Sequence, residues 1–257
     1  MGDKMKNFLI RTASGAVMLI VVLGAMLLSK WSFMALMAAI AIGGMWEFYR
    51  FAEKAGYNPM KVLGIFTGIM ILCTGVAAML FFDLGGDSAS APLLLIAAVS
   101  ALVLIVPLMF ICELYRKSAT PIANIATSLL GALYVAFPMA LLLIVPMLLG
   151  VGKWNPWIMI FYIFIIWAND VFAYLFGITL GRHRLFERIS PKKSWEGFFG
   201  GLLGAMAMGW VAATILEASV PMWVGLALVA AISGVFGDLV ESLMKRSVDV
   251  KDSGNII

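Results

Sequence analysis

Apolar residues in this sequence are gathered into long runs, and most polar residues fall in short segments between those runs. A helix needs about 20 apolar residues to cross the hydrocarbon of a bilayer, and most of the runs approach or exceed that length. We therefore predict an all-α, polytopic integral membrane helix bundle with about eight transmembrane helices. The expected spans are Ala13–Leu28, Trp31–Trp46, Val62–Phe82, Ala91–Cys112, Ile122–Leu149, Trp157–Leu180, Phe198–Leu216 and Met222–Met244.

The composition supports this fold class. Hydrophobic residues make up 63% of the chain, charged residues only 12%, and the mean hydropathy is +1.03. A soluble domain carries about 25% charged residues, so an ordinary soluble enzyme and a disordered chain are excluded. The two cysteines, Cys73 and Cys112, lie within or beside apolar runs and are expected to be buried hydrophobic residues rather than a disulfide framework. His183 is the one histidine, which excludes a multi-histidine metal site.

The positive charges indicate the orientation of the bundle. All of the 18 lysine and arginine residues except Lys30 and Lys153 fall at the two ends of the chain or in the segments after the second, fourth and sixth spans. Because cytoplasmic segments carry an excess of lysine and arginine, we predict that both termini are cytoplasmic. We expect one continuous membrane domain, with N-terminal helices over residues 1–121 and a C-terminal region over residues 122–257 that carries the chemistry.

An acidic residue inside a membrane span is costly, and Asp170 is the first such residue to consider. It follows Asn169 and lies about ten residues before the cytoplasmic end of its span, which is roughly 15 Å deep at 1.5 Å per residue. Tyr174 and Gly177 continue the same helical face. One interpretation is an interhelical hydrogen bond or a snorkelling carboxylate. The other is a carboxylate that lines a polar cavity open to the cytoplasm.

The end of the last span carries a second polar group of residues. Asp238, Glu241, Ser242 and Lys245 are spaced i, i+3, i+4 and i+7, so they share one helical face. An interfacial ion pair between Glu241 and Lys245 would explain two of them without any function. Asp238 lies deeper than such a pair requires, which favours a functional carboxylate.

The segment between these two places, residues 181–197, contains five cations. Such a loop could simply contact anionic headgroups. Within it, however, residues 190–194 read Ser-Pro-Lys-Lys-Ser, and ammonium groups flanked by hydroxyls suit a polyphosphate. His183 lies in the same loop and receives no predicted role. The following glycines are expected to permit a close approach of backbone or helices: Gly197, Gly200, Gly201 and Gly204.

These segments resemble the phosphatidate cytidylyltransferases, also called CDP-diacylglycerol synthases. Residues 242–246 and 251–257 match the family signature S-x-[apolar]-K-R-x4-K-D-x-[small]-x2-[LIF]. Residues 190–197 are similar to its S-P-K-K-[ST]-x-E-G element, and residues 170–177 to its D-x-x-A-Y-x-x-G element. The family signature continues P-G-H-G-G-x-x-D-R-x-D, whereas this sequence ends at Ile257. A chain shortened within the signature is expected to be inactive or weakly active.

The resemblance implies transfer of a cytidylyl group from CTP to phosphatidate, giving CDP-diacylglycerol and pyrophosphate. It implies a multi-pass protein of the inner (plasma) membrane with its active site facing the cytoplasm, and Mg²⁺ or another divalent cation as cofactor. CTP, phosphatidate and membrane lipid are the expected partners, nucleic acid is not, and a homodimer is left open. Under this hypothesis Asp238 binds the metal, and Asp238, Lys245 and Asp170 form the catalytic set. The expected substrate-binding residues are Ser190, Lys192, Lys193, Ser194, Glu196, Arg246, Lys251 and Asp252.

Two alternative functions remain open at this point. A CTP-dependent polyprenol or phytol kinase would also need basic loops and a lipid cavity, but the S-x-x-K-R-x4-K-D string disfavours it. An ion-coupled secondary transporter would use Asp170 and Asp238 as proton or sodium sites. Such transporters often contain repeated halves, and this sequence contains no convincing internal repeat.

Overall fold

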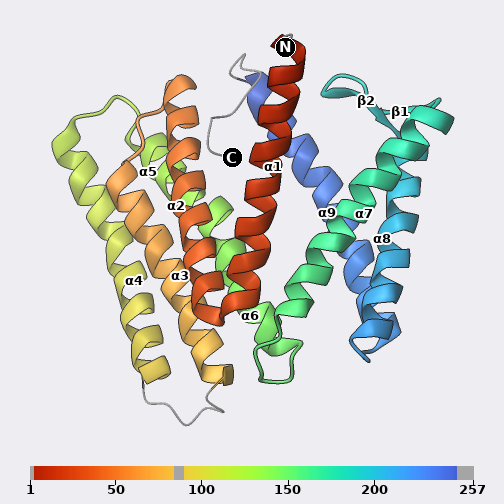
Figure 1. The fold of residues 1–257 in the computed structure, drawn as a ribbon. Coiled ribbons are helices and arrows are strands. Elements are labelled where there is room, and N and C mark those ends of the chain that lie inside the picture. The colour runs from red at the N-terminus through yellow and green to blue at the C-terminus, as the bar shows by residue number, and fades with distance from the viewer. Residues whose placement is uncertain (1–2, 84–89, 248–257) are drawn as a thin grey trace. The chain divides into compact units, whose positions relative to one another are not determined.

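The computed structural model describes residues 3–83 and 90–247, which are almost entirely helical (Figure 1). The helices are α1 (Asp3–Leu28), α2 (Lys30–Lys54), α3 (Lys61–Asp83), α4 (Ser90–Arg116), α5 (Pro121–Gly131), the π-helical segment η1 (Ala132–Ala136), α6 (Phe137–Leu148), α7 (Pro156–Leu180), α8 (Trp195–Ile215) and α9 (Val220–Ser247). Two short strands, β1 (Arg184–Phe186) and β2 (Ser190–Ser194), lie between α7 and α8.

Seven spans in the described ranges are long and apolar enough to cross a membrane, with α5, η1 and α6 counted as one continuous span. Ser14–Leu28 forms a shorter apolar helix at the position of the first expected span. The prediction of an all-α, multi-pass membrane protein is therefore confirmed. The cytoplasmic location of both termini stays a prediction.

The chain forms two compact units. Within the described residues, the first comprises 3–49, 57–83 and 90–156, and the second comprises 50–56 and 157–247. In the first unit α3 packs against α4, α5, η1 and α6.

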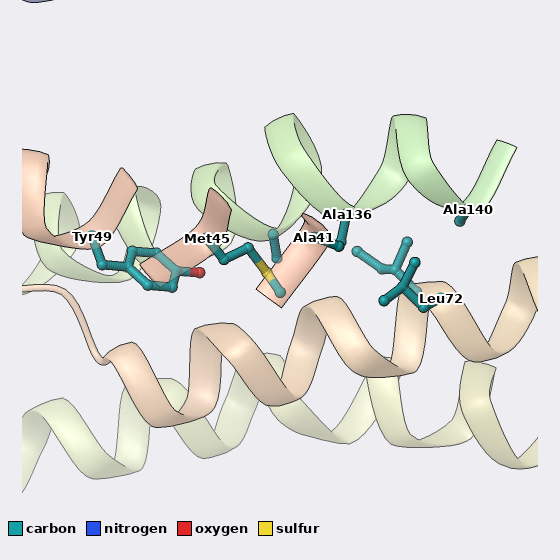
Figure 2. Close-up of a cluster of buried hydrophobic side chains, with 8 residues drawn as sticks. Ala41, Met45, Tyr49, Leu72, Ala136 and Ala140 are labelled. Carbon is teal, nitrogen blue, oxygen red and sulfur yellow. The ribbon is translucent and has the colours of Figure 1, made fainter. Parts of the chain in front are cut away.

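Buried side chains from three spans meet in a cluster within the first unit. Figure 2 shows these side chains in a row that runs from Tyr49 and Met45 of α2 to Leu72 of α3, which lies near Ala136 of η1 and Ala140 of α6. Tyr49 is fully buried, and its hydroxyl donates a hydrogen bond of 2.7 Å to the carbonyl oxygen of Ser128. The hydrogen bond satisfies the phenol where water is excluded, so the ring is held in one position.

Two glycines make room for that ring. A Cβ atom at Gly64 in α3 would overlap the hydroxyl and the ring of Tyr49, and one at Gly131 in α5 would overlap the other ring edge. The small residues therefore let α3 and α5 approach the aromatic side chain closely.

A buried polar network joins the ends of α4 and α5 in the same unit. The amide of Asn124 donates to Glu113 Oε1 and to Ser118 Oγ, each at 2.7 Å, and accepts from the backbone N–H of Asn58 at 2.9 Å. Arg116 forms an ion pair with Glu113 at 2.9 Å. Glu113 is only 3% exposed, and these partners satisfy its charge, so the network is structural.

The fifth span changes its helical register midway. The π-helical segment η1 ends at Ala136, directly before Phe137 and Pro138. Because proline has no N–H, the carbonyl of Tyr134 cannot receive the usual i→i−4 bond from it. A π-helical turn is a common way for a helix to absorb such a change.

The second unit contains the hairpin and three long helices. Helices α8 and α9 lie side by side (Figure 1). Glycines of α8 face α7: a Cβ at Gly197 would lie 2.8 Å from the carbonyl oxygen of Ala173, and one at Gly201 would lie 2.9 Å from that of Asn169. The close helix approach expected at these glycines is confirmed.

The sequence predicts only a loop between α7 and α8. In the structure this segment is an antiparallel hairpin. Arg184 pairs with Ser194, and Phe186 pairs with Ser190. Ser194 is also the N-cap of α8, because its Oγ accepts a hydrogen bond of 3.2 Å from the backbone N–H of Gly197. The strand therefore passes into the helix through a capped turn.

The substitution Gly64→Ala is expected to destabilise the first unit by about 1–3 kcal/mol, which is typical of overpacking. The added methyl group overlaps Tyr49, which cannot move because Gly131 lies on its other side and Ser128 fixes its hydroxyl. Thermal unfolding in detergent measures the effect. Gly24→Ala is the matched control, because a Cβ there meets nothing within 4 Å. Equal melting temperatures for the two variants would contradict this packing.

Candidate functional site

A cavity of about 770 Å³ lies within the second unit, between α7, the hairpin, α8 and α9. Its volume is in the range of ordinary small-molecule sites. Much of its wall is apolar, but both acidic and basic side chains reach it. The polar and charged lining residues are Asn169, Asp170, Tyr174, Arg184, Lys192, Lys193, Ser194, Asp238 and Glu241.

An ion pair crosses this cavity between the hairpin and α9. Lys193 Nζ lies 2.5 Å from Asp238 Oδ2, and the two residues are 45 positions apart in sequence. The Asp238 side chain is 59% exposed, so its carboxylate remains accessible to a ligand. The structure thus brings together two of the predicted site residues, and in this state each neutralises the other.

A second ion pair lies one turn further along α9. Glu241 Oε1 and Lys245 Nζ are 2.5 Å apart, which is the interfacial i, i+4 pair considered from the sequence. Glu241 lines the cavity, whereas Lys245 is not among its lining residues. The predicted catalytic role of Lys245 stays a prediction.

Asp170 is exposed and lines the cavity, as the functional interpretation of this residue requires. Its neighbour Asn169 is only 4% exposed and donates a long hydrogen bond of 3.4 Å to Asp170 Oδ1. Within the described residues Asn169 Oδ1 has no hydrogen-bond partner, and a Cβ at Gly201 would lie 2.7 Å from it. The glycine therefore leaves the space in which the amide packs against α8.

The hairpin contributes the basic wall of the cavity. Lys192, Lys193 and Arg184 all line it. Arg184 was only one of five loop cations in the sequence, and its strand pairing with Ser194 is what places it in the cavity wall. Ser194 is 5% exposed, and its hydroxyl oxygen is already used in capping α8.

Other predicted substrate-binding residues lie outside the cavity lining. Arg246 Nε donates a hydrogen bond of 2.8 Å to the carbonyl oxygen of Ile189 in the hairpin turn. Glu196 binds His183, with 2.7 Å between Oε1 and the histidine Nδ1. Ser190 is not a lining residue either. Lys251 and Asp252 lie outside the described residues.

A divalent cation can be tested against the donors present. Among the residues that the structure describes, no group of three or more His, Cys, Asp or Glu side chains could hold a metal ion. Magnesium is usually bound through one or two carboxylates together with substrate phosphates and water. Asp170 and Asp238 offer two carboxylates in one cavity. These donors fit a cation that arrives with a phosphate ligand better than a cation in an all-protein cage.

The fold and the cavity define a multi-pass membrane protein with a mixed basic and acidic site at the hairpin between α7 and α8. The chain belongs to the cytidylyltransferase family, whose sequence model matches residues 9–257. The resemblance found in the sequence motifs is confirmed at the level of this family.

The chain is also similar to named bacterial proteins. It is 42% identical over 95 residues to the phosphatidate cytidylyltransferase of Staphylococcus aureus (strain COL), and the match covers 36% of each chain. It is 41% identical over 100 residues to that of Staphylococcus epidermidis and 39% identical over 100 residues to that of Staphylococcus saprophyticus, with 38% of each chain covered. The matched stretch therefore spans little more than a third of the length of these relatives.

Proposed function

We propose that this protein transfers a cytidylyl group from CTP to phosphatidate, giving CDP-diacylglycerol and pyrophosphate. The observation that carries the proposal is the cavity, in which Lys192 and Lys193 of the hairpin lie with the carboxylates of Asp170 and Asp238. Membership of the cytidylyltransferase family and the names of the relatives support it. The distribution of lysine and arginine supports a cytoplasmic opening in the plasma membrane, which CTP can reach while phosphatidate enters from the bilayer.

The main obstacle to this reaction is the repulsion between its two anionic substrates. A phosphate oxygen of phosphatidate attacks the α-phosphorus of CTP, the bond from that phosphorus to the bridging oxygen breaks, and pyrophosphate leaves with the electron pair. The nucleophile is already anionic, so a strong general base is not required. Fixed cations that face the triphosphate lower the barrier. Lys192, Lys193 and Arg184 are the cavity-lining cations in a position to do so.

Asp238 and Asp170 are the residues that hold a divalent cation in this proposal. When bound, Mg²⁺ reduces the repulsion between the two anionic substrates and stabilises the charge on the leaving pyrophosphate. Asp238 forms an ion pair with Lys193. The triphosphate competes for the Lys193 ammonium, and the Asp238 carboxylate then becomes available. The lysine thus changes partner from a carboxylate to a phosphate.

CTP labelled in the cytidine ring is expected to label the lipid product when phosphatidate and Mg²⁺ are supplied. Label that reaches lipid only from the γ-phosphate of CTP would instead identify a lipid kinase. Absence of lipid label from either position would overturn the proposal.

The substitution Asp238→Asn is expected to lower kcat by about 10²-fold, because it removes the charge that the cation needs. Lys193→Ala is expected to raise the KM for CTP about tenfold and to leave the KM for phosphatidate nearly unchanged. Arg188→Ala, a hairpin cation outside the cavity lining, is the control. Near-normal activity of Asp238→Asn would show that the role of this aspartate is structural. If Lys193→Ala raised only the KM for phosphatidate, the two substrates would have to be placed the other way round in the cavity.

A further inference from the structure

The two ends of the hairpin are fastened together by one carboxylate and one histidine. His183 Nδ1 lies 2.7 Å from Glu196 Oε1, and the His183 backbone N–H donates to both oxygens of that carboxylate at 3.2 and 3.3 Å. The backbone N–H of Trp195 donates to the carbonyl oxygen of His183 at 2.9 Å. We call these contacts the hairpin clasp. Because an ionised carboxylate only accepts hydrogen bonds, Nδ1 of His183 carries the proton that points at Glu196.

The clasp lies next to the residues that form the basic wall of the cavity. Arg184 directly follows His183 in the chain and pairs with Ser194, two positions before Glu196. Lys193 precedes Ser194 on the same strand. The clasp therefore holds the pairing of Arg184 with Ser194 at the place where the chain leaves α7 and enters α8. The register shifts between this pair and the pair of Phe186 with Ser190, so Lys192 and Lys193 lie in an irregular stretch whose position depends on the clasped end of the hairpin.

The clasp residues do not line the cavity themselves. The His183 side chain is 78% exposed and that of Glu196 is 24% exposed. An exposed pair of this kind contributes little to global stability. Glu196 would be favourable in the first turn of α8 even without a histidine, because a helix N-terminus attracts negative charge. The helix N-terminus does not require the additional contact between Glu196 and His183. We therefore relate this contact to the hairpin.

The other attachments of the hairpin run to α9. Arg246 donates to the carbonyl oxygen of Ile189 at the turn, and Lys193 pairs with Asp238. In the proposed reaction Lys193 exchanges Asp238 for a phosphate, so that second attachment is lost when the nucleotide binds. The clasp does not involve the cavity and remains in place during the exchange.

We propose that His183 is a positioning residue: through Glu196 it holds the hairpin so that Arg184, Lys192 and Lys193 face the triphosphate of the nucleotide. The inference rests on the proposed function, because the ligand it invokes is CTP. The role differs from substrate contact, since the residue acts only through the position of the hairpin.

The test compares wild type, His183→Ala and His183→Asn as the whole chain in lipid nanodiscs. CTP binding in the presence of Mg²⁺ is measured by calorimetry, and amide hydrogen exchange is measured over residues 184–194. His183→Ala is expected to weaken CTP binding about tenfold, because a hydrogen bond to a charged group is lost. Exchange in the hairpin should become faster, while the melting temperature should stay unchanged. His183→Asn is expected to restore both properties, because its amide N–H can occupy the place of the Nδ1–H.

Arg188→Ala is the matched control, since it removes a hairpin cation outside both the clasp and the cavity lining. It should change neither CTP affinity nor hairpin exchange. Unchanged CTP affinity in His183→Ala would overturn the inference, whether or not exchange becomes faster, and so would an asparagine variant that behaves like the alanine variant. If wild type itself does not bind CTP, the proposed function fails. Unchanged hairpin exchange in His183→Ala would then separately show that the clasp does not hold the strands.

Discussion

The ion pair between Lys193 and Asp238 is the interaction on which the proposed site depends. Asp238 belongs to α9, one of the helices apolar and long enough to cross a membrane, where an unpaired carboxylate is costly. Lys193 comes from a hairpin whose own strands are too short to be stable alone. Their contact compensates both charges and connects the hairpin to the helix. Because the Asp238 side chain remains 59% exposed, a ligand can reach the pair and replace one of its partners.

Small residues in α8 determine how closely this helix packs against α7 beside the cavity. Gly197 and Gly201 allow the backbone of α7 to come close, and the cavity then opens beside Asn169 and Asp170. A larger side chain at Gly201 would collide with Asn169, the neighbour of the cavity-lining carboxylate. The same helix begins at Ser194, whose capping hydroxyl ends the basic strand. Helix packing, capping and charge placement therefore depend on one another within a short segment of the chain.

The sequence predicts the helices well because membrane spans are selected by length and hydropathy, which are local properties. The structure places Asp170, Asp238, Lys192 and Lys193, which the resemblance implies as site residues, in the lining of one cavity. The π-helical segment before Pro138 was not predicted, since the register of a helix depends on how its neighbours pack. The roles of these cavity residues remain proposals.

The hairpin is the part of the site that the sequence predicts least well. Its strands are short and polar, so they lack the alternation that would reveal strand pairing. From the sequence, Arg184 is therefore only one of five loop cations, and no role is predicted for His183. The resemblance implies substrate-binding roles for Glu196 and Arg246, which stay predictions. Their side chains contact His183 and the Ile189 carbonyl, contacts that neither charge nor spacing in the sequence could predict.

The exchange of partners by Lys193 is tested most directly by Mn²⁺ binding, followed by electron paramagnetic resonance with and without CTP. Because Lys193 forms an ion pair with the Asp238 carboxylate, wild type should bind Mn²⁺ weakly alone and much more tightly when CTP is present. Lys193→Ala frees the carboxylate and should bind Mn²⁺ without CTP more tightly than wild type does. Tight binding of Mn²⁺ to wild type in the absence of nucleotide, unchanged by Lys193→Ala, would contradict the account.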